Sequence, residues 1–259
     1  MQHFHTHHIE SAALGVTRRL TVFVPGPPKH GASRYPVLYL NDGQNLFDPA
    51  RAFAGNTWRV AETVTGLIEA GIIPPIVVVG IDHGEIRRAR EYLPVSDDRN
   101  PFARRPLGRR YVEFVVREVM PFVQREFPVG RGPSNTGVGG SSYGAVAALF
   151  TALEAPGKFG RLLIESPSLY VGRGRMLRRA RRAQAWPARV YLGVGTSETS
   201  RAEWNEETVI NVMRLEQILK KAGLGPRRLR MVIEHGATHS EGAWAARLPF
   251  ALAFLFGPS

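Results

Sequence analysis

The sequence predicts an α/β fold: a mostly parallel central sheet with helices on both faces and an antiparallel hairpin at its start. Short, nearly continuous apolar runs alternate with amphipathic segments along the chain, as in parallel strands buried on both faces and joined by helices. The first two strand-like runs instead alternate polar and apolar residues around a tight turn, which indicates a hairpin. No composition shift, linker or internal repeat divides the 259 residues. We therefore expect one domain, residues 1–259.

The expected strands are apolar runs bounded by turn residues. They are residues 4–11, 17–24, 35–40, 76–81, 136–139, 162–165, 189–194 and 229–234. The first two form the hairpin around Leu14 and Gly15. The runs 35–40 and 76–81 are apolar almost throughout, which is typical of strands without a solvent face.

The expected helices follow from apolar residues three or four positions apart. They are residues 57–70, 109–127, 143–153, 206–221 and 241–256. In the first, Trp58, Ala61 and Val64 share one face, and Gly71 ends the helix, since glycine readily adopts the left-handed conformation of a helix terminus. In the second, Pro121 predicts a kink.

Composition excludes several classes of protein. The chain carries 34 Lys+Arg against 22 Asp+Glu, a formal charge of +12, and 44% of its residues are hydrophobic, enough for a folded core. The absence of cysteine excludes a disulfide scaffold, a thiolate metal site and a cysteine nucleophile. We find no zinc-finger spacing, RNP motif or helix-turn-helix signature and expect no nucleic-acid partner. An acidic ligand or simple solubility explains the charge.

The N-terminal segment is rich in histidine, and we expect no signal peptide in it. Its first eight residues lack the apolar core of a signal peptide, and no apolar run in the chain approaches the roughly 18 residues of a membrane span. We expect a cytoplasmic protein without membrane contact. His3, His5 and His7 alternate, with His8 beside them, which is compatible with a metal site. An exposed edge strand is the better explanation, and we assign no metal.

A serine motif lies between the strand at 136–139 and the helix at 143–153. Gly140-Ser141-Ser142-Tyr143-Gly144 fits the pattern G-x-S-x-G with Ser142 in the middle. A sharp strand-to-helix turn at this place exposes a serine oxygen at the carboxyl edge of the sheet, and glycines permit the tight backbone. Ser142 is therefore a candidate nucleophile, with an ordinary strand-to-helix turn as the alternative.

A nucleophilic serine needs a base, usually oriented by a carboxylate. His239 follows the last expected strand and directly precedes the last helix, whereas its rival His235 still belongs to the end of that strand. Glu198 lies on the loop after the strand at 189–194. The order Ser142, Glu198, His239 is the one that α/β-hydrolase topology produces.

Other acids stay open for the third role. Glu203, Glu206 and Glu207 lie close to Glu198 in the chain, and a Ser–His dyad without an acid is also compatible with the pattern. Asp82 follows a strand but precedes the serine, which breaks the usual order.

With these residues in place, the chain resembles the Putative-esterase family of α/β-hydrolases, which includes enterochelin esterases, feruloyl and acetylxylan esterases, S-formylglutathione hydrolases and mycolyltransferases. It is most similar to the small bacterial enterochelin-esterase-like members, over nearly its whole length. The resemblance implies the α/β-hydrolase fold, with Ser142 as nucleophile, Glu198 as acid and His239 as base. The motifs that carry it are residues 40–47, 119–122, 139–145, 195–198 and 239–244.

The resemblance also implies an oxyanion hole built from the backbone N–H groups of Tyr143 and Gln44. The Tyr143 amide lies at an expected helix N-terminus, where the helix dipole favours negative charge. Asp42 is expected to hold this loop in shape rather than to react.

Substrate-contacting residues are the least specified part. Our candidates are Asp42, Arg90, Tyr170 and Trp204. Arg90 is a candidate for an anionic ester, or else a solvated loop arginine, and the two aromatic side chains are candidate walls for an acyl or aryl group. The arginine-rich run 173–182 lies within 167–186, where α/β-hydrolases often carry a cap. It is either a short basic lid or a solvated helix face.

We therefore expect a serine esterase that hydrolyses small carboxylic esters through an acyl-enzyme and requires no cofactor. An acyltransferase with the same triad is one alternative. A non-catalytic basic binding module on the same scaffold is another, because fold alone does not prove activity. The positive charge is compatible with an anionic ester, and neither the particular ester nor the oligomeric state follows from the sequence.

Overall fold

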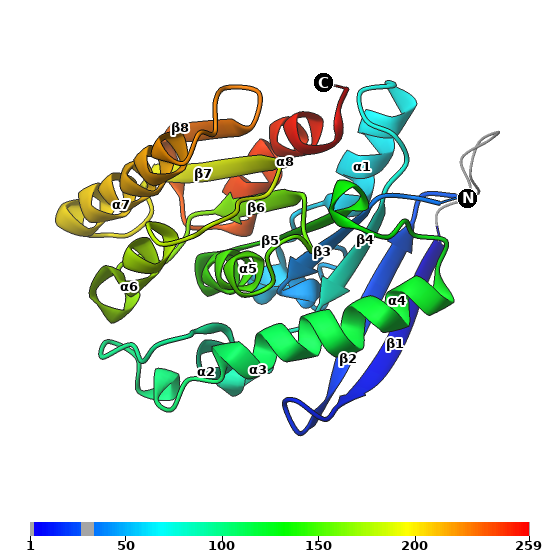
Figure 1. Cartoon of the computed structure of the whole chain (residues 1–259), viewed down its shortest axis with the longest axis horizontal. Coiled ribbons are helices and arrows are strands. Elements are labelled where there is room, and N and C mark those ends of the chain that lie inside the picture. Colours follow the sequence, from blue (N-terminus) through cyan, green and yellow to red (C-terminus); the bar gives the residue numbers. More distant parts are fainter. Residues whose placement is uncertain (1–2, 27–33, 259) are drawn as a thin grey trace.

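A twisted eight-stranded sheet forms the centre of the computed structural model, which describes residues 3–26 and 34–258 (Figure 1). The strand order is β1-β2-β4-β3-β5-β6-β7-β8. The strands are β1 His3–Ser11, β2 Val16–Val24, β3 Val37–Asn41, β4 Val77–Ile81, β5 Thr136–Ser141, β6 Arg161–Glu165, β7 Arg189–Ser197 and β8 Leu229–Thr238.

The pairing confirms the predicted sheet. β1 and β2 form an antiparallel hairpin, and β2 pairs antiparallel with β4. All remaining neighbours are parallel. The carboxyl ends of β3 through β8 therefore meet at one edge, and β5 lies between β3 and β6 near the middle.

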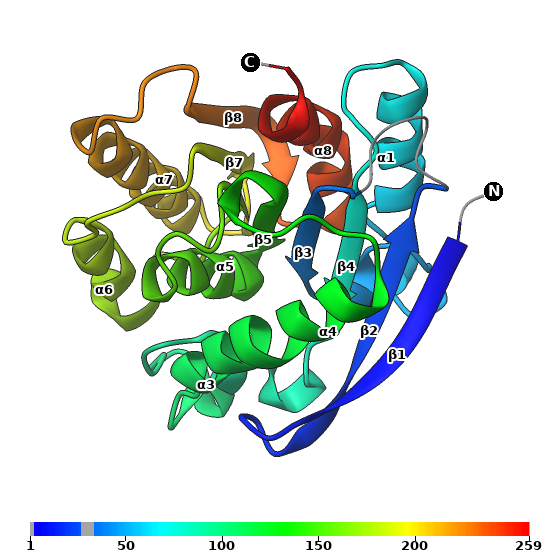
Figure 2. The same ribbon diagram turned by 45° about the vertical axis from the view of Figure 1, so that its right-hand side comes forward.

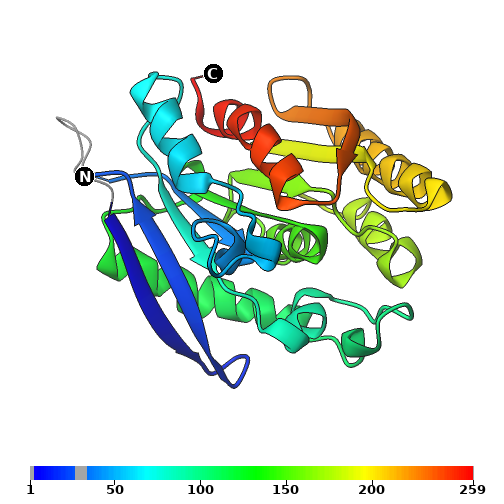
Figure 3. The same ribbon diagram turned by 180° about the vertical axis from the view of Figure 1, so that it is seen from behind.

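Helices cover both faces of the sheet. They are α1 Val60–Glu69, α2 Arg88–Tyr92, α3 Gly108–Glu113, α4 Met120–Glu126, α5 Ser142–Glu154, α6 Val171–Ala180, α7 Ala202–Lys221 and α8 Glu241–Phe256. Helices α1 and α8 lie on one face (Figure 3). The others lie on the opposite face, where α3 and α4 form one long helical run (Figure 2).

Two hydrophobic cores result from this layering. Leu38 and Leu40 pack with residues of α1 and α8, whereas Tyr39 between them packs with residues of α5 and its neighbours. Successive side chains of a strand point to opposite faces, so a continuous apolar strand supplies both cores. This is why the runs predicted as buried strands carry no polar alternation.

The long helix accommodates Pro121 through a π-helical turn. Residues Phe114–Val119 join α3 to α4 in this wider form, and the Met120 N–H donates to the Val115 carbonyl. Proline has no N–H to donate. The irregularity is thus next to the predicted kink, and the proline falls in the first turn of α4.

The pairing of β7 with β8 extends further than predicted. Ser197 pairs with Thr238, after an irregularity at Gly195. The residues that follow these two, Glu198 and His239, therefore leave the sheet side by side at its carboxyl edge. In contrast, α1 begins three residues later than expected, because Arg59 adopts a left-handed backbone with φ of 51°.

The segment 167–186 contains α6. Val171, Met176, Leu177 and Ala180 are buried, and α6 packs against α5 and α7. Among the described residues, no helix combines the length and the apolar composition that crossing a bilayer requires.

Candidate active site

Ser142 occupies a strained turn between β5 and α5. Its φ is 57°, in the left-handed region that non-glycine residues rarely adopt, whereas Ser141 before it is extended. A side chain at Gly144 would place its Cβ 2.6 Å from Asp42 Oδ2, so glycine is required for this close approach. The Ser142 side chain is half-buried, with Oγ 3.5 Å from Ser168 Oγ.

The structure brings Glu198 and His239 into direct contact. His239 Nδ1 lies 2.5 Å from Glu198 Oε2, and the glutamate side chain is almost fully buried while the histidine side chain is one-third exposed. A carboxylate on Nδ1 leaves Nε2 as the ring nitrogen free to accept a proton.

Two further groups hold the Glu198 carboxylate. Its Oε1 accepts hydrogen bonds from Ser166 Oγ at 2.7 Å and from the Gly195 backbone N–H at 2.6 Å. Ser166 Oγ in turn accepts a 2.9 Å hydrogen bond from Trp244 Nε1, and the Trp244 ring meets the His239 ring edge-on at 5.0 Å. Glu198 is therefore oriented from β6, β7 and α8 together.

These contacts determine the charge state of Glu198. Burial by itself raises the pKa of a carboxyl group. Hydrogen bonding to His239 and the charge of that ring, together with the bonds from Ser166 and Gly195, outweigh burial and lower the pKa of Glu198 below its ordinary value. Glu198 is thus held as the carboxylate that a neighbouring imidazolium requires.

The rival residues lie elsewhere. His235 is exposed on β8, and Glu203 and Glu206 are exposed on α7. Glu207 approaches Arg99, at 3.8 Å. Asp82 pairs with Arg51 instead. Glu198 is the carboxylate that the structure joins to His239.

The loop after β3 carries Asp42 and Gln44. Asp42 has a left-handed backbone with φ of 58°. Its carboxylate accepts two hydrogen bonds from Arg88, at 2.6 Å from Nε and 2.9 Å from Nη2. Gln44 lies in the helical turn Gly43–Asn45, and its Oε1 accepts the His83 backbone N–H at 3.1 Å. The loop is thus attached to the chain after β4.

Polar bonds also join the end of β3 to the start of α5. Asn41 Nδ2 donates to the Gly144 carbonyl at 2.7 Å, and Asn41 Oδ1 accepts from the Tyr111 hydroxyl at 2.5 Å. Tyr111 is almost completely buried, with 2% of its surface exposed. The turn that holds Ser142 and the loop that holds Gln44 are therefore fixed to each other.

The arginine at this loop is Arg88 rather than Arg90. Arg90 Nε donates to the Arg105 carbonyl. Burial lowers the pKa of Arg88, but the Asp42 carboxylate outweighs it and raises that pKa. Only the rotational phase of α2 decides which of the two arginines faces Asp42, and the sequence pattern did not reveal it.

A pocket of about 550 Å³ is lined by both aromatic candidates, Tyr170 and Trp204, but not by Ser142, Glu198 or His239. Tyr143, the residue after Ser142, is part of its wall, and its hydroxyl donates to Asp97 Oδ2 at 2.6 Å. The guanidinium carbon of Arg99 lies 4.8 Å from the centre of the Tyr170 ring and 5.5 Å from that of Trp204. Sequence reasoning missed Arg99.

The N-terminal histidines pack against aromatic side chains. The His7 ring lies edge-on to Phe122 at 5.0 Å, and the His5 ring to Phe127 at 5.4 Å. Within residues 3–26 and 34–258, no group of three or more His, Asp or Glu side chains is placed to hold a metal ion.

Sequence reasoning also missed Ser166 and the role of Trp244. Ser166 directly follows the apolar strand at 161–165, so its place at the carboxyl edge was a usable signal. Trp244 comes five residues after His239 in α8, and its indole N–H had no visible partner in the sequence.

Comparison with known proteins identifies the family. The family model described as "Putative esterase" matches residues 11–255. A protein of Bacillus subtilis called YbbA, described as uncharacterized, is 24% identical over 246 residues, covering 93% of each chain. The iron(III) enterobactin esterase of Dickeya dadantii is 32% identical over 163 residues, which is 62% of this chain but 32% of that protein.

A solved structure shares the fold. An IroE-like serine hydrolase from Shewanella oneidensis superposes with a TM-score of 0.77 at 19% identity, covering 98% of this chain and 80% of that one. The family match spans most of the sequence, and the chain belongs to the Putative esterase family.

Proposed function

We propose that this member of the Putative esterase family, a carboxylic-ester hydrolase, works through Ser142 as nucleophile, His239 as general base and Glu198 as the acid that orients the histidine. The observation that carries the proposal is the hydrogen bond between His239 and the buried Glu198 carboxylate. It forms at the same sheet edge that presents Ser142 in a left-handed turn.

Acylation requires His239 Nε2 to reach the Ser142 hydroxyl. His239 Nε2 takes the proton of Ser142 while Oγ attacks the ester carbonyl carbon. The carbonyl oxygen becomes an oxyanion, which the backbone N–H groups of Tyr143 and Gln44 stabilise. When the tetrahedral intermediate collapses, the C–O bond to the alcohol breaks and His239 returns the proton to the leaving oxygen.

Deacylation repeats the sequence with water. His239 takes a proton from water as the water oxygen attacks the acyl carbon, and the carboxylic acid leaves as Ser142 regains its proton. Glu198 stabilises the imidazolium in both steps and stays ionised. Removal of one oxyanion donor costs about 2.7–4 kcal/mol of barrier in serine hydrolases, and this site needs no cofactor for any of these steps.

The substrate we propose is a small ester with an anionic or aromatic part. The pocket that Tyr143 lines combines Tyr170 and Trp204 with the Arg99 guanidinium, which also has the Glu207 carboxylate at 3.8 Å. The two rings support an aromatic part, and a guanidinium with only one distant carboxylate supports an anionic one. The Dickeya relative carries an enterobactin esterase name, so catecholate lactones belong in the test panel with acetyl-sugar, feruloyl and thioester substrates.

The decisive experiment is the turnover of p-nitrophenyl acetate and butyrate. We expect Ser142→Ala to lower kcat/KM at least about 10³-fold and to abolish labelling by a fluorophosphonate. Ser141→Ala is the matched control, because it removes a hydroxyl from the preceding residue, which is buried at the end of β5. Equal rates for the wild type and Ser142→Ala would overturn the proposal.

A further inference from the structure

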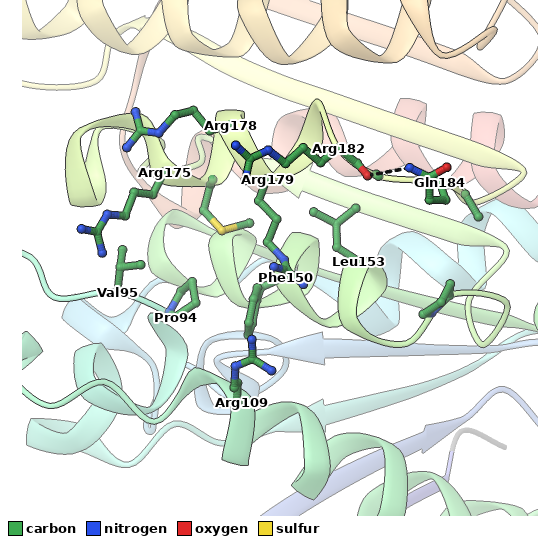
Figure 4. Close-up of a pocket in the computed structure, with 14 residues that line it drawn as sticks. Pro94, Val95, Arg109, Phe150, Leu153, Arg175, Arg178, Arg179, Arg182 and Gln184 are labelled. Atoms are coloured by element: carbon green, nitrogen blue, oxygen red, sulfur yellow. Dashed lines mark hydrogen bonds between the residues drawn. The ribbon is translucent and has the colours of Figure 1, made fainter.

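A second pocket, of about 600 Å³, lies between α5, α6 and the start of α3 (Figure 4). Its lining contains none of the three candidate catalytic residues. Phe150, which lines it, follows Ser142 by eight positions on α5, about 12 Å along a helix. Five arginines line it: Arg109, Arg175, Arg178, Arg179 and Arg182.

These arginines have little neutralising charge around them. Glu154 contacts Arg109 at 3.5 Å and also pairs with Arg179. Within the described part of the chain, it is the one carboxylate that forms an ion pair with any of the five. Arg178 donates to the backbone carbonyl of Arg173. Two of the five guanidinium groups thus contact the same carboxylate, and those of Arg175 and Arg182 have no hydrogen-bond or ion-pair partner among the described residues.

The crowding is unfavourable in the empty pocket. Arg175, Arg178, Arg179 and Arg182 are spaced at i, i+3, i+4 and i+7, so their charges share one side of α6 and the turn after it, and like charges at such spacing repel. Arg109 lies in the first turn of α3, where the helix dipole disfavours a cation. Burial and the nearby Arg109 charge both lower the pKa of Arg179.

Apart from Gln184, the rest of the lining is apolar. Pro94, Val95 and Leu153 are half-buried, and Pro156 is exposed. The Arg179 guanidinium covers the Phe150 ring at 5.3 Å. A bare inorganic ion would leave this apolar wall against water, whereas an anion with a ring or a short apolar body would cover it.

We propose that this arginine pocket binds a small organic polyanion, with two or more phosphoryl charges attached to a ring or short apolar body. Guanidinium groups bind phosphoryl oxygens in a bidentate manner and stay charged at any physiological pH. The site is independent of the proposed esterase chemistry, because no residue of the triad lines it.

Titration calorimetry in about 150 mM salt tests the proposal, with ADP, inorganic pyrophosphate and adenosine as probes and the Ser142→Ala protein as receptor. This receptor separates the result from the esterase activity. The pocket variant is Arg175→Gln/Arg182→Gln. The matched control, Arg181→Gln/Arg227→Gln, removes the same charge from two exposed arginines outside the lining.

We expect ADP to bind more tightly than pyrophosphate, and adenosine most weakly. The pocket variant should weaken ADP binding at least about tenfold, and the control less than about threefold. Absence of ADP binding at millimolar concentration would overturn the proposal, as would an equal loss in both variants, which would indicate overall charge alone. Equal affinities for ADP and pyrophosphate would overturn the inference that the ligand carries a ring or a short apolar body. A thermal unfolding scan identifies any variant that fails to fold, and Arg178→Gln then replaces it.

Discussion

Glu165 and Glu198 are two glutamates at the carboxyl ends of neighbouring strands, and the fold uses them in different ways. Glu165 ends β6 and Glu198 follows β7, and they are 1% and 6% exposed. Glu198 accepts hydrogen bonds from three groups. Glu165 Oε2 accepts two N–H bonds from Arg247, while its Oε1 is buried without a hydrogen-bond partner among the described residues.

Their pKa values shift in opposite directions as a result. Burial, with smaller contributions from the charges of Glu198 and Glu234, raises the pKa of Glu165 to about 7 despite Arg247. The donors around Glu198 lower its pKa despite similar burial. Burial alone therefore does not decide whether a carboxyl group can support catalysis. The donors that stabilise the charged form decide it.

The largest expected effect separates the two glutamates by activity. We expect Glu198→Gln to lower kcat/KM about 10³–10⁴-fold, because an amide neither stabilises the imidazolium nor selects its tautomer. Glu165→Gln is the matched control, the same change on the next strand, and should lower kcat/KM less than about threefold. Steady-state kinetics on p-nitrophenyl butyrate measure both. Equal losses would contradict the assigned roles.

The second prediction concerns pH and the free energy of unfolding. A pKa of about 7 in place of 4.5 for Glu165 means that the folded state retains a proton that the unfolded state releases. This contribution to stability is present below about pH 4.5 and is lost as the pH rises through 7, by about 3 kcal/mol. Urea unfolding between pH 5 and 8 should show the decline in the wild type and a flatter curve in Glu165→Gln.

Glu198 should show the opposite sign in the same experiment. Its lowered pKa stabilises the folded protein above the ordinary carboxyl pKa, and that contribution is lost as the pH falls through the lowered value. The stability difference between the wild type and Glu198→Gln should therefore shrink towards acid pH. If the free energy of unfolding had the same pH dependence in Glu165→Gln and Glu198→Gln, the opposite pKa shifts of the two glutamates would be contradicted.

A smaller effect is expected at Ser166, whose hydroxyl donates to Glu198. Ser166→Ala should lower kcat/KM about tenfold, since a hydrogen bond to a charged group contributes about 1.5–3 kcal/mol. The acid limb of the pH–rate profile should also move to higher pH, because the Glu198 carboxylate loses a donor. A loss of activity with an unmoved acid limb would count against this positioning role.

The smallest effect is expected at Trp244, whose indole N–H orients Ser166. Trp244→Phe keeps an aromatic ring beside His239 but removes this donor, and we expect kcat/KM to fall about threefold. Trp58→Phe is the control. The Trp58 ring lies 5.7 Å from the Trp244 ring, centre to centre, but among the described residues Trp58 makes no hydrogen bond to Ser166. Combining Trp244→Phe with Ser166→Ala should add little, since both act through one hydroxyl.

Local patterns in the sequence were sufficient for the sheet and for the candidate triad residues. Buried parallel strands need uninterrupted apolar runs, and a serine turn needs small residues around it, so both leave signals within a few positions. The order Ser142, Glu198, His239 then followed from strand order alone. The long helix was predicted as one element, but the form of its irregularity depended on how the backbone relaxes around Pro121.

Tertiary structure alone decided which side chains support that site and which charges gather elsewhere. Ser166 and Trp244 are 78 positions apart, and Arg88 and Asp42 are 46 apart, so no local pattern joins them. Whether Arg88 or Arg90 faces Asp42 depends on helix phase, and the arginine pocket forms only where residues of α3, α5 and α6 come together. The sequence by itself determined the elements and their chemistry, because these depend on neighbours along the chain. The contacts between elements depend on packing, and only the folded chain decided them.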